Sequence, residues 1–212
     1  PKVVVFCLDW SLSMLTRDTG TGLSRFGTCV RCVRRILRDQ VRDEDFVGVV
    51  GFGATVETAV LPTVKKGNAA SLDTTIAGLQ AQRLGGTCFF DAVLECLQQL
   101  GQASSAAPPD APRWLVCLTD GDDLGSRRDN THGELVTRAL EAKEAENLNV
   151  VMITVGRLKE RNIEVIDGWV ERVASAGGFA QHLSESNASA ITSAFSVVAE
   201  CLAAEVGGAT EC

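Results

Sequence analysis

The sequence predicts an α/β protein with a doubly wound, mostly parallel central sheet of about six strands, with helices on both of its faces. Two observations predict this fold class. Short apolar runs, typical of strands buried on both faces, recur along the chain. Segments with apolar residues at helical spacing alternate with them. Because the alternation fills nearly all of the 212 residues, we expect one domain over 1–206 and a tail over 207–212.

The first part of the chain predicts three strands and two helices. The run 3–8 is apolar throughout and indicates a buried strand. Residues 24–41 begin with a serine typical of N-caps and repeat apolar side chains at intervals of three and four, which predicts a helix. A second buried strand is expected over 46–52. Residues 55–61 alternate in polarity, which indicates an antiparallel edge strand. A weak helix is expected over 71–79.

The middle of the chain continues the alternation. We expect a helix over 91–99, and then a surface connection rich in Ala, Ser and Pro. The apolar run 114–118 predicts another buried strand. Thr131 and Glu134 fit a capping box, so a helix is expected from there to about 146.

The last part predicts two strands and two helices. Residues 150–155 form a fifth strand, and the helix 162–176 stops at two glycines, which are a C-cap signal. Residues 179–183 are expected to be a short edge strand. The final helix runs over 188–204, and we interpret Asn187 as its cap in preference to a glycosylation site.

Charge and hydropathy exclude two classes of partner. The net charge of −7 argues against nucleic acid, since binding phosphates depends on clustered Lys and Arg. No apolar run approaches the ~20 residues that span a bilayer, so membrane insertion is not expected. Arginines line one face of the helix 24–41, and we interpret them as a solvated face in preference to a docking surface. The chain begins at Pro1 without Met, which suggests a piece of a larger multidomain protein.

The eight cysteines do not form the pattern of a disulfide framework. Cys7 and Cys117 lie inside apolar runs, where a thiol packs as a small hydrophobe. Cys29 and Cys32 lie within a helix, away from the N-terminal position that is usual for redox motifs. We therefore predict free thiols, which favour an intracellular, cytoplasmic setting over secretion.

Polar residues follow the first strand directly. Asp9, Ser11 and Ser13 come off its carboxyl end, where open α/β sheets bind their ligands. One carboxylate with two hydroxyls, and no His or Cys among them, suits a small hard cation such as Mg²⁺.

The stretch Asp9-Trp10-Ser11-Leu12-Ser13 resembles the D-x-S-x-S signature of the von Willebrand factor A family, which opens a metal-ion-dependent adhesion site. Two later segments also resemble that family, in the right order. They are Gly85-Gly86-Thr87-Cys88-Phe89-Phe90-Asp91 and Leu115-Val116-Cys117-Leu118-Thr119-Asp120-Gly121-Asp122-Asp123. The resemblance covers nearly all of residues 2–206 and implies a Rossmann-like fold.

The resemblance also implies a ligand set. Ser11, Ser13 and Thr87 supply hydroxyl oxygens directly to the cation, while Asp9 and Asp120 act mostly through water. Neutral hydroxyls leave the cation much of its charge, so an Asp or Glu of a protein partner fills the open coordination position. Mg²⁺ is expected, and Mn²⁺ or Ca²⁺ would accept the same oxygens.

The motif departs from the family pattern at one position, and two interpretations are open for Trp10 and for the acidic pair Asp122 and Asp123. Leu12 stands where the family often has Gly, which suggests a stiffer loop. We expect Trp10 to be exposed or half-buried beside the metal and to shape the partner surface; the alternative is that it packs on a neighbouring loop. Asp122 and Asp123 either bind a water of the site or form a solvated acidic turn, and we favour the turn.

Three other functions compete with cation-dependent protein recognition. The strand ending in Asp9 distantly resembles the haloacid-dehalogenase phosphatases, but Ser11 stands where their general acid is needed, so we do not expect an enzyme. A metal-free structural scaffold is the second alternative. The third is a domain of an ATP-driven metal chelatase assembly. The sequence favours a divalent-cation-dependent interaction domain.

Overall fold

The computed structural model describes residues 1–82, 85–103, 106–129, 131–141 and 147–204. Its strands are β1 (Val3–Asp9), β2 (Phe46–Phe52), β3 (Val56–Val64), β4 (Arg113–Thr119), β5 (Leu148–Val155) and β6 (Ala180–Glu185). Its α-helices are α1 (Arg25–Asp39), α2 (Ala69–Ala77), α3 (Phe89–Gln102), α4 (Glu134–Glu141), α5 (Glu160–Ser175) and α6 (Ile191–Ala204). Two short 3₁₀ helices also occur, at Leu12–Leu15 and Ala188–Ala190.

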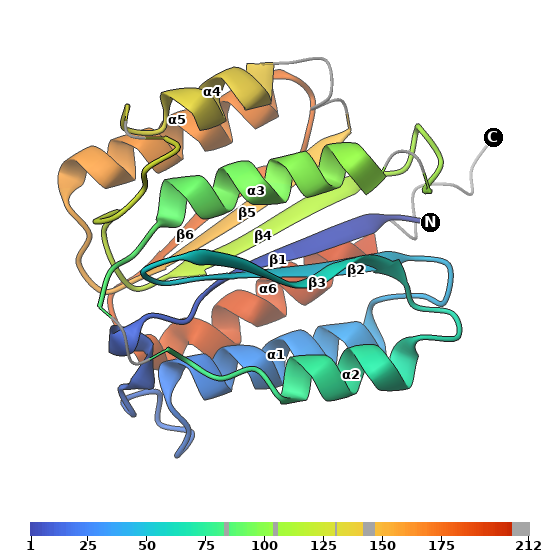
Figure 1. The fold of residues 1–212 in the computed structure, drawn as a ribbon, viewed down its shortest axis with the longest axis horizontal. Helices are drawn as coiled ribbons and strands as arrows, with labels where there is room; N and C mark the ends of the chain where they lie inside the picture. Colours follow the sequence, from blue (N-terminus) through green and yellow to red (C-terminus); the bar gives the residue numbers. More distant parts are fainter. Residues whose placement is uncertain (83–84, 104–105, 130, 142–146, 205–212) are drawn as a thin grey trace.

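The elements form three layers around one sheet (Figure 1). The strand order is β3-β2-β1-β4-β5-β6, and every pair is parallel except β2 with β3. Helices α1, α2 and α6 cover one face of the sheet, and α3, α4 and α5 cover the other. This confirms the predicted doubly wound sheet with one antiparallel edge strand. No helix in the described ranges is long and apolar enough to cross a membrane.

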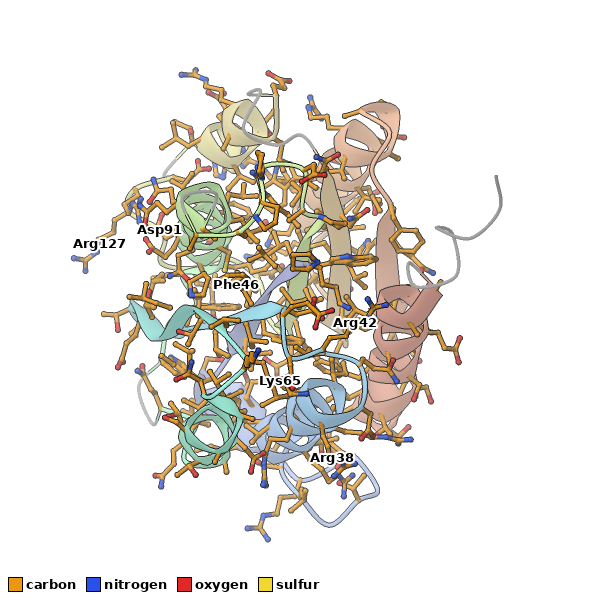
Figure 2. The ribbon with its side chains drawn as sticks, turned by 90° about the vertical axis from the view of Figure 1, so that its right-hand side faces the viewer. Arg38, Arg42, Phe46, Lys65, Asp91 and Arg127 are labelled. Atoms are coloured by element: carbon orange, nitrogen blue, oxygen red, sulfur yellow. The ribbon has the colours of Figure 1, made fainter. Side chains whose placement is uncertain are left out.

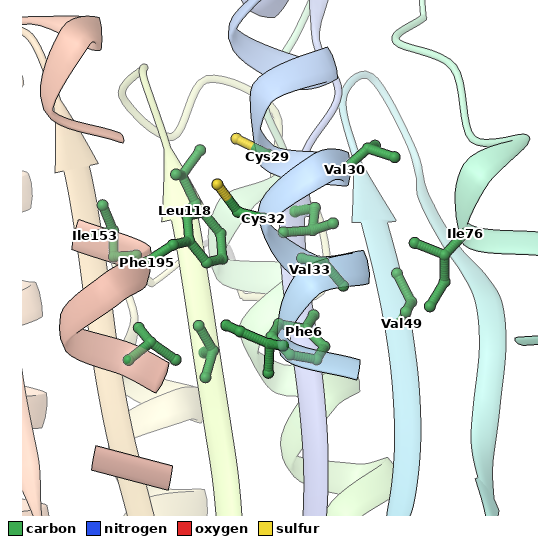
Figure 3. Close-up of a cluster of buried hydrophobic side chains, with 14 of the residues drawn as sticks. Phe6, Cys29, Val30, Cys32, Val33, Val49, Ile76, Leu118, Ile153 and Phe195 are labelled. Atoms are coloured by element: carbon green, nitrogen blue, oxygen red, sulfur yellow. The ribbon is translucent and has the colours of Figure 1, made fainter. Parts of the chain in front are cut away.

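Strand β1 lies at the centre, and all seven of its residues are buried. Its apolar side chains alternate between two cores, one on the α1 face and one on the α3 face. Figure 3 shows part of the first core, where side chains of the sheet such as Phe6 and Leu118 meet Phe195 of α6. Burial on both faces explains why this strand is apolar without alternation.

The chain switches sides at β1, because β2 pairs along one edge of that strand and β4 along the other. In an open α/β sheet such a switch point leaves a crevice at the carboxyl ends of the two strands. Leu8 pairs with Leu118, so Asp9 comes level with the end of β4. The register therefore brings the residues after both strands to the same place.

The structure corrects the start of α4. Thr131 does not cap this helix; its hydroxyl donates to Asp129 Oδ1 at 3.0 Å. The buried Asp129 carboxylate instead accepts from the backbone N–H of Gly133 at 3.1 Å and of Val136 at 3.0 Å. A carboxylate satisfies the N–H just before the helix and one in its first turn, and it also suits the helix dipole. The predicted end of this helix, residues 142–146, lies outside the described residues, as does the tail 207–212.

Other predicted helix ends are confirmed. The Ser24 hydroxyl accepts from Gly27 N at the start of α1. Gly177, after α5, has a φ of +89°, and Gly178 N donates to the carbonyl of Val173. Asn187 accepts from Ser189 N and so caps the 3₁₀ turn that leads into α6.

The arginine face of α1 is largely paired. Arg34 binds Asp73 of α2 in a two-point contact, and Arg38 binds Asp39 in the same way. Arg38 and Arg42 lie with Lys65 at the amino-terminal end of the sheet (Figure 2). This internal pairing supports the interpretation as a solvated face.

Seven cysteines lie in the described ranges, and all are free thiols. Cys212 lies outside those ranges. Cys7 and Cys117 face each other across β1 and β4, and both are buried. Burial raises the pKa of Cys117 and of Cys29, which keeps these thiols protonated and unreactive.

Candidate functional site

The side chain of Asp9 is fixed at the end of β1. It is 0% exposed, and both of its oxygens accept hydrogen bonds. Ser11 N donates to Oδ1 at 2.9 Å, and the Thr119 hydroxyl donates to Oδ2 at 2.8 Å. Thr119 ends β4, so one carboxylate links the two strands at the switch point.

The two serines lie on the turn that follows. Ser11 Oγ and Ser13 Oγ are 3.0 Å apart, and Ser13 Oγ donates to Asp120 Oδ1 at 2.6 Å. The turn keeps its shape because Met14 N bonds to the carbonyl of Ser11, while the Met14 side chain is buried in the core. A continuous series of hydroxyl and carboxylate oxygens therefore runs from β1 to β4.

Thr87 approaches this series from the loop before α3. Gly86 has a φ of +119°, which favours glycine, and a Cβ there would lie 3.1 Å from Ala54. The Thr87 carbonyl accepts from Leu124 N at 2.9 Å. A Cβ on Gly121 would lie 3.6 Å from Thr87 Oγ1, so this hydroxyl borders the loop after β4.

Hydrogen bonds thus link Asp9, Ser11, Ser13 and Asp120 at one edge of the sheet, while Thr87 borders the loop that follows Asp120. Within the part of the chain that the structure describes, no three His, Cys, Asp or Glu side chains are arranged to hold a metal. A cation here would depend on the hydroxyl oxygens together with the two carboxylates. That donor set contains oxygen alone, which fits Mg²⁺ and other hard cations.

Arg25 also belongs to this site, although we did not predict it. Its Nη1 lies 2.7 Å from Asp120 Oδ2, and the Asp120 side chain is fully buried. Its other nitrogens bind Asp18 in a two-point contact. One signal was present in the sequence: an arginine in the first turn of a helix opposes the helix dipole, so it needs an acidic partner.

The electrostatics of the site are set by burial. Burial raises the pKa of Asp9 to about 6, and the nearby charge of Asp120 raises it further, while hydrogen bonds from Ser11 and Thr119 oppose the rise. At neutral pH the Asp9 carboxyl is therefore mostly ionised, and Arg25 pairs with Asp120. The remaining negative charge favours a cation.

The structure overturns the prediction for Trp10. The side chain is buried, and its ring covers β2. A Cβ on Gly51 would lie 2.2 Å from the ring, and one on Gly53 would lie 3.3 Å from it. The carbonyl of Trp10 also accepts from Gln82 N at 2.6 Å. Trp10 therefore packs between the site loop and β2 and offers no surface to a partner.

The preferred interpretation of Asp122 and Asp123 as a solvated turn is also wrong. Asp122 Oδ1 accepts from Lys159 N at 2.7 Å and from Asn162 Nδ2 at 2.6 Å, at the start of α5. Asp123 accepts from Phe90 N at 3.1 Å, at the start of α3, and burial raises its pKa. Both helices begin at this edge with free N–H groups, and the two carboxylates satisfy them.

A second hydrogen-bonded series resembles a nucleophile triad. Asp167 Oδ1 lies 2.7 Å from His182 Nδ1, and His182 Nε2 lies 2.9 Å from Thr154 Oγ1. Thr154 is only 2% exposed, so its hydroxyl is closed to a substrate. The series joins β5, β6 and α5 and has a structural role.

The strand order that switches sides at β1, together with the oxygen-lined edge at the carboxyl ends of β1 and β4, is the arrangement of a von Willebrand factor type A domain. The sequence model of that family, described as von Willebrand factor type A domain, matches residues 4–122, more than half of the chain. The chain therefore belongs to this family. No curated protein matches the chain in sequence.

Solved structures agree on the fold. The PilB minor pilin from Streptococcus sanguinis aligns with a TM-score of 0.70 and 16% identity, over 100% of this chain and 63% of that one. A von Willebrand factor type A protein from Catenulispora acidiphila gives 0.66 and 19%, over 97% and 43%. Proximal thread matrix protein 1 from the mussel byssus, with a zinc-occupied MIDAS motif, gives 0.64 and 16%, over 93% and 47%. The chain thus spans less than two thirds of each of these three structures.

Proposed function

We propose that this domain binds a divalent cation at Asp9, Ser11, Ser13, Thr87 and Asp120, and uses the cation to recognise a carboxylate of a protein partner. The observation that supports this most directly is the series from Ser11 through Ser13 to Asp120, with oxygens 3.0 and 2.6 Å apart. These atoms bond to one another, and a cation would accept the same lone pairs.

The donor types support Mg²⁺ as the cation. Mg²⁺ binds oxygen ligands and keeps several waters, so carboxylates that act through water suit it. Mn²⁺ and Ca²⁺ accept similar ligands, and zinc occupies the MIDAS motif of the mussel protein. We propose Mg²⁺ on ligand type and availability.

The charge of such a site supports a carboxylate as the partner group. Three of the five proposed ligands are neutral hydroxyls. These neutral ligands leave a divalent ion much of its positive charge, which an Asp or Glu side chain of another protein would balance. The overall charge of −7 remains unfavourable for nucleic acid.

A binding role is also favoured over catalysis. Ser11 stands where a phosphatase of the haloacid-dehalogenase type needs its general acid, and here it bonds to Ser13. We further propose that the domain is part of a larger protein and works inside the cell, which the free thiols support.

One observation favours a metal-free scaffold as the second candidate. Arg25 already neutralises Asp120, and Asp9 has hydrogen bonds to both of its oxygens. The site is therefore satisfied without a cation, and metal binding has to compete with these contacts.

Calorimetric titration of Mg²⁺ into chelator-treated protein separates the two candidates. Ser13→Ala and Thr87→Val each remove one proposed ligand, and Ser71→Ala is the matched control because Ser71 is exposed on α2. We expect Mg²⁺ affinity to fall about ten- to a hundredfold in the first two variants and to stay unchanged in the control. Circular dichroism checks that all of them fold. Absence of heat at millimolar Mg²⁺ in the unaltered protein would leave the scaffold as the function.

A further inference from the structure

Exposed leucines gather on the loops that build the proposed site. Among the described residues, six large hydrophobic side chains are exposed. Four of them are within four residues of a site residue or of Arg25: Leu12 (50% exposed), Leu15 (39%), Leu23 (38%) and Leu124 (68%). The other two, Leu61 of β3 and Phe179 before β6, lie elsewhere on the sheet. Single exposed leucines are ordinary, but four on adjoining loops are not.

We call Leu12, Leu15, Leu23 and Leu124 the apolar rim, because hydrogen bonds join their loops into one structure. Leu12 lies between the two serines, and Ser13 binds Asp120 of the loop that carries Leu124. Leu124 N donates to the Thr87 carbonyl. Leu23 precedes the start of α1, where Arg25 N donates to the Thr16 carbonyl and the Arg25 side chain reaches Asp120. The rim is therefore held in place around the oxygen series.

We propose that the apolar rim selects a partner loop whose Asp or Glu is flanked by bulky apolar side chains. This inference rests on the proposed function and adds the neighbours of the carboxylate. A contact between a cation and a carboxylate is weak where water competes with it, and apolar contacts around it exclude that water. Burying a leucine also contributes free energy of its own. A bare acidic surface would leave the rim exposed to solvent, whereas an acidic residue between apolar ones would cover it.

A protein fits the rim better than a lipid surface does. Binding to anionic lipids draws on clusters of roughly four to eight Lys or Arg. The loop that carries Leu15 and Leu23 contains Arg17 and reaches Arg25, but Arg25 is held by Asp18 and Asp120. On the loop that carries Leu124, Arg128 binds Glu95, so Arg17 and Arg127 remain, fewer than such a cluster needs.

The test selects peptides from a random phage-displayed library on Mg²⁺-loaded protein and elutes them with chelator. Affinities of the selected peptides are then measured by fluorescence anisotropy, and Mg²⁺ binding by calorimetry. The variants are Leu124→Ser and Leu12→Ser, and Leu61→Ser is the control because Leu61 is 62% exposed on β3.

We expect the eluted peptides to carry Asp or Glu next to bulky apolar residues. Leu124→Ser should weaken peptide binding about tenfold, which corresponds to ~1.4 kcal/mol, and should leave Mg²⁺ binding unchanged. Leu61→Ser should change neither. Leu12→Ser should act in the same direction as Leu124→Ser.

Three results would overturn the inference, and they differ in what else they affect. If Mg²⁺ binds but the acidic peptides lack apolar neighbours and bind Leu124→Ser equally well, the rim is unimportant and the proposed function stands. If Mg²⁺ does not bind, both fail. If Mg²⁺ binds, no peptide elutes, and phosphatidylserine-containing vesicles bind in a manner that Leu124→Ser abolishes, the partner is a membrane surface.

Discussion

Raising the pH should destabilise the metal-free protein through Asp9. The folded-state pKa of this carboxyl is about 6, against 3.8 for an unperturbed aspartate, so the folded state holds the proton more tightly than the unfolded chain does. This contribution to stability is complete below the unfolded pKa and is lost as the pH rises through the folded one. The difference in pKa, with one unit equal to ~1.4 kcal/mol, predicts a loss of about 3 kcal/mol between about pH 4 and pH 7.

The assay is urea unfolding of chelator-treated protein, followed by tryptophan fluorescence across that pH range. Burial also raises the pKa of Asp123, which gives a slope of the same sign, while arginine partners lower the pKa of Asp18 and of Asp73, whose contributions change mainly below about pH 4. Asp9→Asn is the control, because an amide can still accept from Ser11 N while Thr119 turns its hydroxyl to the Gly121 carbonyl. The stability of the native chain minus that of Asp9→Asn isolates the one carboxyl.

We expect that difference to fall by about 3 kcal/mol with rising pH and to recover when Mg²⁺ is added near neutral pH. A flat difference would refute the reasoning, because it would mean that burial does not hold the proton on Asp9. Loss of stability without recovery by Mg²⁺ would keep the burial effect and count against the cation.

Three further predictions concern the surroundings of the site. Arg25→Met should lower the free energy of unfolding of the metal-free protein by ~1–2 kcal/mol, because the buried Asp120 loses its partner. It should also tighten Mg²⁺ binding about tenfold in calorimetry, because a competing positive charge is removed. Weaker Mg²⁺ binding would instead mean that the arginine positions Asp120. Gly51→Ala should cost about 3 kcal/mol in urea unfolding because the added methyl meets the ring of Trp10, whereas Gly101→Ala in α3 meets nothing within 4 Å and should not destabilise. Asp91→Ala should cost ~2–3 kcal/mol, since this buried carboxylate accepts from three successive backbone N–H groups of the loop after β4; a cost below ~0.5 kcal/mol would contradict that role.

The sheet could be predicted from the sequence because a strand that is buried on both faces is a short run of apolar residues, which is visible without knowing its neighbours. Strands β1, β2, β4 and β5 each contain a mostly apolar run, and each was expected within one or two residues of its observed bounds. The edge strand β3 is only partly buried, and its polar and apolar residues alternate accordingly. Helix ends were less accurate where the capping group is distant in the sequence or belongs to another loop, as with Asp129 for α4 and Asp122 for α5.

The proposed ligands also divide into those that the local sequence predicts and those that depend on distant loops. Asp9, Ser11 and Ser13 lie within five residues, and the strand before them was enough to suggest a cation. Thr87 and Asp120 came only from the family resemblance, because their approach depends on how loops meet in space. Trp10 was misjudged for that reason, since the room for its ring is made by glycines on another strand.

Arg25 connects the two candidate functions of the domain. With the arginine on Asp120, the buried carboxylate is balanced, so the metal-free fold is stable enough to exist. A cation that binds the same carboxylate must weaken that ion pair, so the measured affinity is a difference between two favourable interactions. Arg25 also binds Asp18 on the loop between Leu15 and Leu23. Loading the site should therefore alter the contacts that hold part of the apolar rim, and a partner that prefers one arrangement of the rim would by linkage change the affinity for the cation.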